Sequence, residues 1–220
     1  PSLVGSEMCI RDRGRAGRMR VRLVVIVADS DRGRVYLPAT EEHEKIAQKA
    51  KPGWKPEEYI AHDPRALWTP PYGLTTFGDL FTPRQLTAMV TLSDLIREVR
   101  EDIQQDALDA GLSEAEAEEY ARAVVTLLAL ALDRCADFNN ALCRWSPSNE
   151  KVMNLFSRQA IPMVWDFAEA NLLGDSVGAW ITCSNYVAEC ALTFATSADG
   201  HARLIDAAKP WDGLKGVLVS

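Results

Sequence analysis

Two carboxylates three residues apart form the most suggestive chemical pair in this sequence. Asp166 and Glu169 lie within RQAIPMVWDFAEAN, residues 158–171, where Pro162 suits the first turn of a helix. Residues three apart share a helical face, and two carboxylates on one face can exchange protons or hold a metal. A solvated or hydrogen-bonded face is the more usual role of such a pair. We predict that this segment forms a site wall, made of Arg158, Gln159, Trp165, Asp166, Glu169 and Asn171.

The cysteines and histidines show no spacing that is typical of a metal site or of a second reactive site. The five cysteines include no CxxC pair, and the chain holds only three histidines, which predicts reduced thiols in a cytoplasmic protein and no metal site. Cys143 precedes Arg144, whose charge favours a thiolate, but no histidine lies nearby in sequence. A buried, inert thiol is the more common role. Cys183 and Cys190 stand seven residues apart, a spacing more typical of packing than of metal binding.

Arginines are candidates for contacts with nucleic-acid phosphates. We predict such contacts at Arg84 and Arg144, while a salt bridge at the edge of the core is the more ordinary role of each. The net charge is −7, and residues 94–119 hold ten acids and two bases. Because a phosphate backbone is repelled by such a surface, any DNA contact is expected elsewhere in the chain.

A long helix is predicted between Thr82 and Ala110. Thr82 can cap its first turn, Pro83 fits the first helical position, and Gln85 can reach back to complete a capping box. Gly111 is suited to end it. Its apolar residues recur at three- and four-residue spacing and predict one buried stripe, formed by Leu86, Met89, Val90, Ile96, Val99, Ile103 and Ala107.

A second long helix is predicted to begin after Ser113, with Glu116 completing its capping box, and to continue through Phe138. Its centre is apolar on nearly every face, so we expect it to be the most buried helix. Further short helices are predicted from Ser146-Pro147 to Phe156 and from a cap at Asp175 or Ser176 to about Ala195.

The first third of the chain is organised differently. Two β-rich runs around a turn at residues 31–33 predict a hairpin. A short helix over residues 41–49 and an extended connector to residue 71 follow, and we expect Trp54, Tyr59 and Trp68 to pin the connector. Residues 1–13 show neither structural period and resemble translated adapter read-through. The arginines that follow suit either a basic arm for nucleic acid or a frayed end, namely Arg15, Arg18, Arg20 and Arg22. We expect residues 1–19 to be an artefactual or disordered leader.

The predicted fold is therefore mainly α with an N-terminal β-hairpin. Residues 20–71 form the hairpin and connector, residues 72–197 a helical domain, and residues 198–220 two strands that need further partners to close a sheet. The longest apolar run, residues 123–132, is too short to cross a bilayer, which needs about 20 residues. No contact with a membrane is expected.

Three longer strings resemble a known family. YGLTTFGDLFTPRQL, ALDRCADFNNALCRW and RQAIPMVWDFAEAN occur in this order in what looks like the middle of large adenine-specific DNA methylases that carry a zinc ribbon. These methylases are often encoded beside anti-phage systems. The resemblance spans roughly residues 20–220 and rests on long strings, which makes it more specific than a short motif.

The resemblance implies an S-adenosylmethionine-dependent enzyme that acts on double-stranded DNA, with other defence proteins as further partners. In the family, a glycine-rich cofactor loop and the zinc ribbon lie upstream of this region, and an Asp-Pro-Pro-Tyr motif follows a strand resembling GVLVS. Neither the glycine-rich loop nor the Asp-Pro-Pro-Tyr motif occurs in this chain. The last strands, residues 198–220, would thus begin an incomplete α/β methyltransferase sheet, and Asp206 would lie near the cofactor's adenine, unless it simply ends a strand at the surface.

These observations predict a fragment of a DNA adenine methyltransferase that is inactive alone, with no catalytic residue among its own. Methyl transfer to the exocyclic amine of adenine needs an extruded base whose amine is held by polar oxygens and whose ring is stacked on an aromatic side chain. Asp-Pro-Pro-Tyr supplies these groups in the family. The alternative is a non-catalytic helical module that positions DNA or a partner protein.

Overall fold

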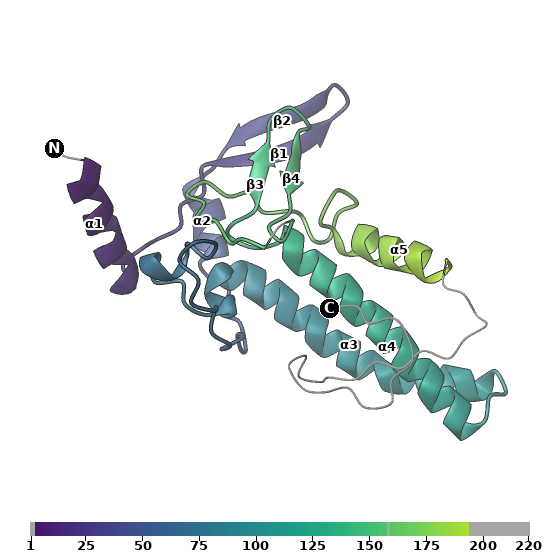
Figure 1. Cartoon of the computed structure of the whole chain (residues 1–220). Coiled ribbons are helices and arrows are strands. Elements are labelled where there is room, and N and C mark those ends of the chain that lie inside the picture. The colour runs from purple at the N-terminus through teal and green to yellow at the C-terminus, as the bar shows by residue number, and fades with distance from the viewer. Residues whose placement is uncertain (1–2, 158, 194–220) are drawn as a thin grey trace.

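The computed structural model describes residues 3–157 and 159–193. The structure is mainly helical, with two small antiparallel sheets (Figure 1). In chain order the elements are α1 Leu3–Arg15, β1 Val25–Ser30, β2 Gly33–Pro38, α2 Glu41–Ala47, the 3-10 helices η1 Pro70–Tyr72 and η2 Phe77–Leu80, α3 Pro83–Asp109, α4 Glu114–Phe138, β3 Arg144–Ser146, β4 Lys151–Met153 and α5 Trp180–Ala191.

The two predicted long helices, α3 and α4, are present, and they pack as a long antiparallel hairpin (Figure 1). The Thr82 hydroxyl accepts from the Gln85 amide, and the Gln85 side chain accepts from the Thr82 amide, which confirms the capping box. Gly111 has a φ of 95°, a left-handed conformation that glycine adopts without strain, and it ends α3. A second capping box joins Ser113 and Glu116 at the start of α4. The predicted stripe on α3 is buried or half-buried along its length.

Helix α4 is less buried than predicted. Its buried residues are Ala117, Ala121, Ala131 and Cys135, whereas Leu130 and Tyr120 are about half exposed. Among the described elements, α3 follows α4 along its length and α5 covers part of its C-terminal half (Figure 1). Two neighbouring helices cannot cover all faces of an apolar helix, so part of its apolar surface remains open.

The predicted N-terminal hairpin is confirmed. Strands β1 and β2 pair from Val25 opposite Pro38 to Ser30 opposite Gly33, with Asp31 and Arg32 as the turn. The hairpin meets the second sheet where the Tyr36 ring packs edge-on against Trp145 of β3, with ring centroids 6.4 Å apart.

Aromatic side chains do not pin the connector. Trp54, Tyr59 and Trp68 are all exposed, which corrects the prediction. The connector is held instead through its backbone, because Ile60 donates to the Thr75 carbonyl and Trp68 donates to the Ile161 carbonyl, at 2.9 and 3.0 Å. Extended backbone has polar groups without partners in its own segment, so it forms such bonds readily. The connector is therefore anchored by its backbone, while its aromatic rings stay exposed to solvent.

The short helix predicted from Ser146 to Phe156 is a β-hairpin. Strands β3 and β4 pair through Trp145 and Val152, with residues 147–150 as the turn. Proline followed by serine and asparagine suits a tight turn as well as a helix start, and the Asn149 side chain donates to the Ser146 hydroxyl at 3.0 Å to close it. The prediction failed because the two uses of proline share one sequence pattern.

The helix predicted around Pro162 is also absent. Residues 159–179 run as irregular backbone apart from a parallel bridge between Ile161 and Leu67. This bridge and a hydrogen bond from the Ala168 amide to the Cys143 carbonyl, at 2.7 Å, hold the segment extended. Helix α5 then begins after Ala179 without a side-chain cap, later than the predicted Asp175 or Ser176.

The ends of the chain differ from the middle. Residues 3–15 of the expected leader form helix α1, which contacts η1 where Gly14 lies against the Tyr72 backbone. The predicted strands in residues 198–220 lie outside the described residues. Across residues 3–157 and 159–193, no helix combines the length and the apolar character that a bilayer crossing demands.

Candidate functional site

The three strings that carry the family resemblance meet in one place. We call the described parts of these strings, residues 72–86, 131–145 and 159–171, the block junction. Leu80, Leu142 and Ile161, one from each string, lie in a single buried cluster. The Ala141 amide donates to the Leu80 carbonyl at 2.7 Å, which joins the first string to the second. The bond from Ala168 to Cys143 joins the second string to the third.

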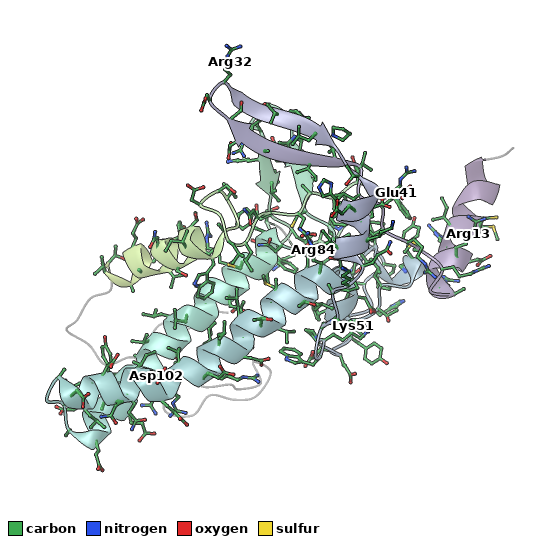
Figure 2. All side chains as sticks on the ribbon, turned by 180° about the vertical axis from the view of Figure 1, so that it is seen from behind. Arg13, Arg32, Glu41, Lys51, Arg84 and Asp102 are labelled. Atoms are coloured by element: carbon green, nitrogen blue, oxygen red, sulfur yellow. The ribbon has the colours of Figure 1, made fainter. Side chains whose placement is uncertain are left out.

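A predicted DNA contact and a predicted wall residue are bound to each other in the junction. Arg84, in the first turn of α3, donates from Nε to Glu169 Oε1 at 2.6 Å, and its terminal nitrogen also pairs with that oxygen. The Glu169 side chain is 26% exposed and that of Arg84 is 57% exposed. Arg84 is thus neutralised by Glu169 at the junction end of α3, whereas Asp102 lies toward the far end of that helix (Figure 2).

The predicted wall is only partly assembled. The Trp165 ring packs edge-on against Tyr72 at 5.1 Å between centroids and is 57% exposed. Gln159 and Asp166 are exposed, and Asn171 accepts from the Leu173 amide in a local turn. Because residues 159–171 are not helical, Asp166 and Glu169 do not share a helical face, which was the arrangement expected for this carboxylate pair.

Three other predicted residues have different outcomes. Arg158 and Asp206 lie outside the described residues. Arg144 is exposed at the start of β3, and no ion pair joins it to another described side chain. Among the predicted arginines that the structure describes, Arg144 is therefore the one with its charge open to a phosphate.

Cys143 is buried and inert. Burial raises the pKa of its thiol to about 11, and the nearby Asp137 charge acts in the same direction. Its sulfur donates to the Asp137 carbonyl at 3.3 Å. A thiol with a raised pKa is a weak nucleophile at neutral pH, so the side chain packs the junction and does not support covalent chemistry.

A polar network at the end of α4 was not foreseen from the sequence. The Asp137 carboxylate accepts from the Phe156 amide at 2.6 Å and from the Asn154 side chain at 3.0 Å. The buried Asn139 side chain donates to the carbonyls of Cys135 and Gly178. The signal for it is the string Asp-Phe-Asn-Asn at a helix end, since short polar side chains there satisfy free backbone groups.

Asp79 organises the loop before α3. One carboxylate oxygen accepts from the amides of Thr75 and Thr76, and the other accepts from Lys55 Nζ at 3.1 Å. Burial acts to raise the pKa of Asp79, but these hydrogen bonds outweigh it and the pKa is lowered. The carboxylate therefore stays charged and fixes the loop.

The junction is a structural arrangement in which the carboxylates are hydrogen-bonded, whereas Thr76 Oγ1 and Gln85 Nε2 are buried without a hydrogen-bond partner among the described residues. Over the described ranges, no three His, Cys, Asp or Glu side chains are grouped so as to hold a metal. The carboxylates of Asp79, Asp137 and Glu169 are each bound by hydrogen bonds that fix the backbone or another side chain. What the arrangement can do is hold α3, α4 and the loop of residues 159–171 in one fixed relation.

Comparison of the chain with protein-family models, with curated proteins and with solved structures gives no match.

Proposed function

We propose that this chain is a non-catalytic part of an S-adenosylmethionine-dependent DNA adenine methyltransferase of a prokaryotic modification or defence system. The observation that carries the proposal is the block junction. Three strings, chosen only for their resemblance to the methylase family, come together in one buried cluster. Strings that form the core of a family's domain are expected to pack together, and the junction agrees with that expectation.

In this proposal the chain is a scaffold. The junction fixes the start of α3 and the end of α4, and α5 follows on the outer side of α4 (Figure 1). The cofactor and the Asp-Pro-Pro-Tyr loop belong to other parts of the parent enzyme, and residues 198–220 would enter its methyltransferase sheet. Arg84 and Arg144 are the proposed DNA contacts, and Asp206 is the proposed cofactor contact.

The charge distribution limits where DNA can lie. Acidic residues gather on the part of the α3–α4 hairpin that is distant from the junction, as Asp102 illustrates (Figure 2). The phosphate backbone is repelled there. DNA is therefore expected at the junction end, where it must displace Glu169 from Arg84 to use that arginine.

Methyl transfer tests the proposal. The full-length parent protein, incubated with DNA and labelled S-adenosylmethionine, should produce N6-methyladenine, and the 220-residue chain alone should produce none. The matched control is the parent with the aspartate of its Asp-Pro-Pro-Tyr motif changed to alanine, which should be inactive. Methyl transfer by the isolated chain, or a parent that methylates no adenine, would overturn the proposal.

The second candidate is a helical module without chemistry that positions DNA or a partner protein. The observation that favours it is the exposure of apolar residues along the α3–α4 hairpin, namely Leu95, Tyr120 and Leu130. Exposed apolar residues that adjoin one another on neighbouring helices are typical of a surface that another protein covers. A parent protein that lacks methyl transfer but retains a stable partner or DNA complex would favour this candidate.

A further inference from the structure

Two thiols that are far apart in sequence face each other between α4 and α5. Cys135 lies near the end of α4 and Cys183 in the second turn of α5, and both are fully buried. They belong to one buried cluster with Met89, and the two thiols are close enough to shift each other's pKa. The pattern of cysteines along the chain gave no sign of this pair, because the nearest spacing links Cys183 with Cys190.

The surroundings of the pair make the two thiols unequal. The hydrogen bond from Cys135 lowers the pKa of Cys183, and the positive charge of Arg134 acts in the same direction. The same hydrogen bond, together with burial, raises the pKa of Cys135. Arg134 is held beside the pair because its guanidinium lies over the Tyr186 ring, 3.7 Å from the centroid. The charge of Arg134 therefore favours a thiolate within the pair.

Helix α5 gives a small oxidant a route to the pair. It has twelve residues, of which only Cys183 is buried, and Ile181 and Tyr186 are about half exposed. A short helix with so little buried surface opens locally far more often than the whole chain unfolds. Such opening exposes Cys183 while leaving α3 and α4 in place.

We propose that Cys135 and Cys183 form a redox switch that locks α5 onto α4. The Cys183 thiolate attacks a hydroperoxide, forming a sulfenic acid and releasing an alcohol or water. The Cys135 sulfur then attacks the sulfenic sulfur, its proton leaves with the hydroxyl group as water, and the disulfide bond forms. In sum, two thiols and one hydroperoxide give one disulfide, one alcohol and one water, so the two thiols are oxidised and the hydroperoxide is reduced.

The bond would join positions 48 residues apart (183 − 135). It would restrict the unfolded chain and should raise the Tm by about 5–10 °C. The inference does not depend on the proposed methylase function, since it concerns only the packing of α5 on α4.

The test uses the 220-residue chain with Cys9→Ser and Cys190→Ser, which removes the two exposed thiols. After treatment with hydrogen peroxide, the chain is unfolded, alkylated and digested without reductant. A linked peptide of Cys135 and Cys183 is expected, with Cys143 alkylated as the internal control and the Tm raised until dithiothreitol is added. If all three thiols are still alkylated at a dose that fully oxidises Cys190 in the unsubstituted chain, the proposal is wrong.

A second variant tests the order of the steps. With Cys135→Ala in the same background, no disulfide can form, and Cys183 should accumulate as a sulfenic acid that a dimedone reagent traps. Trapping at Cys143 instead of Cys183 would contradict the assignment. If this variant does not fold, the linked-peptide measurement on the reference chain still decides the proposal.

Discussion

Asp79 shows how a single carboxylate can fix a loop. It accepts hydrogen bonds from two backbone amides and from the Lys55 ammonium, and these contacts together hold η2 against the connector. Asp79→Asn removes the charge but keeps the size, and we expect a loss of about 1 kcal/mol in the free energy of unfolding. Chemical denaturation measures this loss. Asp166→Asn, a change at an exposed carboxylate, is the matched control and should be nearly neutral.

The stabilisation that Asp79 contributes should depend on pH. Because the pKa of Asp79 is lowered below 3.8 in the folded chain, its stabilisation is complete above that value and is lost as the pH falls through the folded pKa. The difference in unfolding free energy between the unsubstituted chain and Asp79→Asn should therefore be constant from about pH 5 to 7 and shrink below about pH 4. A difference that grows on acidification would contradict the lowered pKa.

The Arg84 and Glu169 pair links two of the three strings. Since both side chains are partly exposed, solvent screens the pair, and a double-mutant cycle with Arg84→Met and Glu169→Gln should give a coupling of about 0.5–1 kcal/mol. The coupling should weaken at high salt. A cycle with Arg97→Met and Asp94→Asn, a pair within one helix, serves as control and should give less.

At the scale of elements, Gly178 sets the distance between the loop before α5 and α4. Its φ is 85°, and a Cβ there would lie 2.8 Å from Phe138 Cβ and 2.9 Å from Ala170 Cβ. Gly178→Ala should therefore cost about 2–4 kcal/mol of unfolding free energy, through backbone strain and displaced packing. Gly53→Ala is the matched control, because nothing lies near its added methyl group. Equal stability of the two variants would contradict the close approach.

Elements with several agreeing local signals were predictable from the sequence. Local sequence preferences correctly predicted the capping boxes of α3 and α4, the end of α3 at Gly111 and the β1–β2 turn. The conformation of residues 146–171 was not predictable, because prolines that fit the first turn of a helix also fit turns and extended backbone. There the outcome depends on distant partners such as Leu67 and Cys143, which no local pattern reveals.

The candidate site shows the same division. Arg84 and Glu169 were both chosen from the sequence, but their pairing across 85 residues follows from the fold alone. The Asp137 and Asn139 network and the Cys135 and Cys183 pair likewise depend on how α4 meets later segments. Residue types can thus be recognised along the chain, while their partners require the three-dimensional structure.

At the scale of the whole molecule, the acidic part of the α3–α4 hairpin and the junction should behave differently toward DNA. If the proposed function holds, replacing Glu101 and Asp102 with glutamine and asparagine should leave DNA binding by the parent protein unchanged or slightly stronger, because these side chains repel phosphate. Arg144→Gln should weaken binding and reduce its salt dependence. Fluorescence anisotropy with labelled duplex DNA measures both. Stronger binding by Arg144→Gln would place the DNA elsewhere.

The central claim is the proposal that this chain is part of a DNA adenine methyltransferase. In that proposal, the three strings that resemble the methylase family form the block junction. Longer sequence reads of the same locus test it most directly. The claim predicts an Asp-Pro-Pro-Tyr motif immediately after Ser220, with a glycine-rich loop and paired cysteines encoded upstream of Arg20. A stop codon or an unrelated reading frame directly after Ser220 would contradict it.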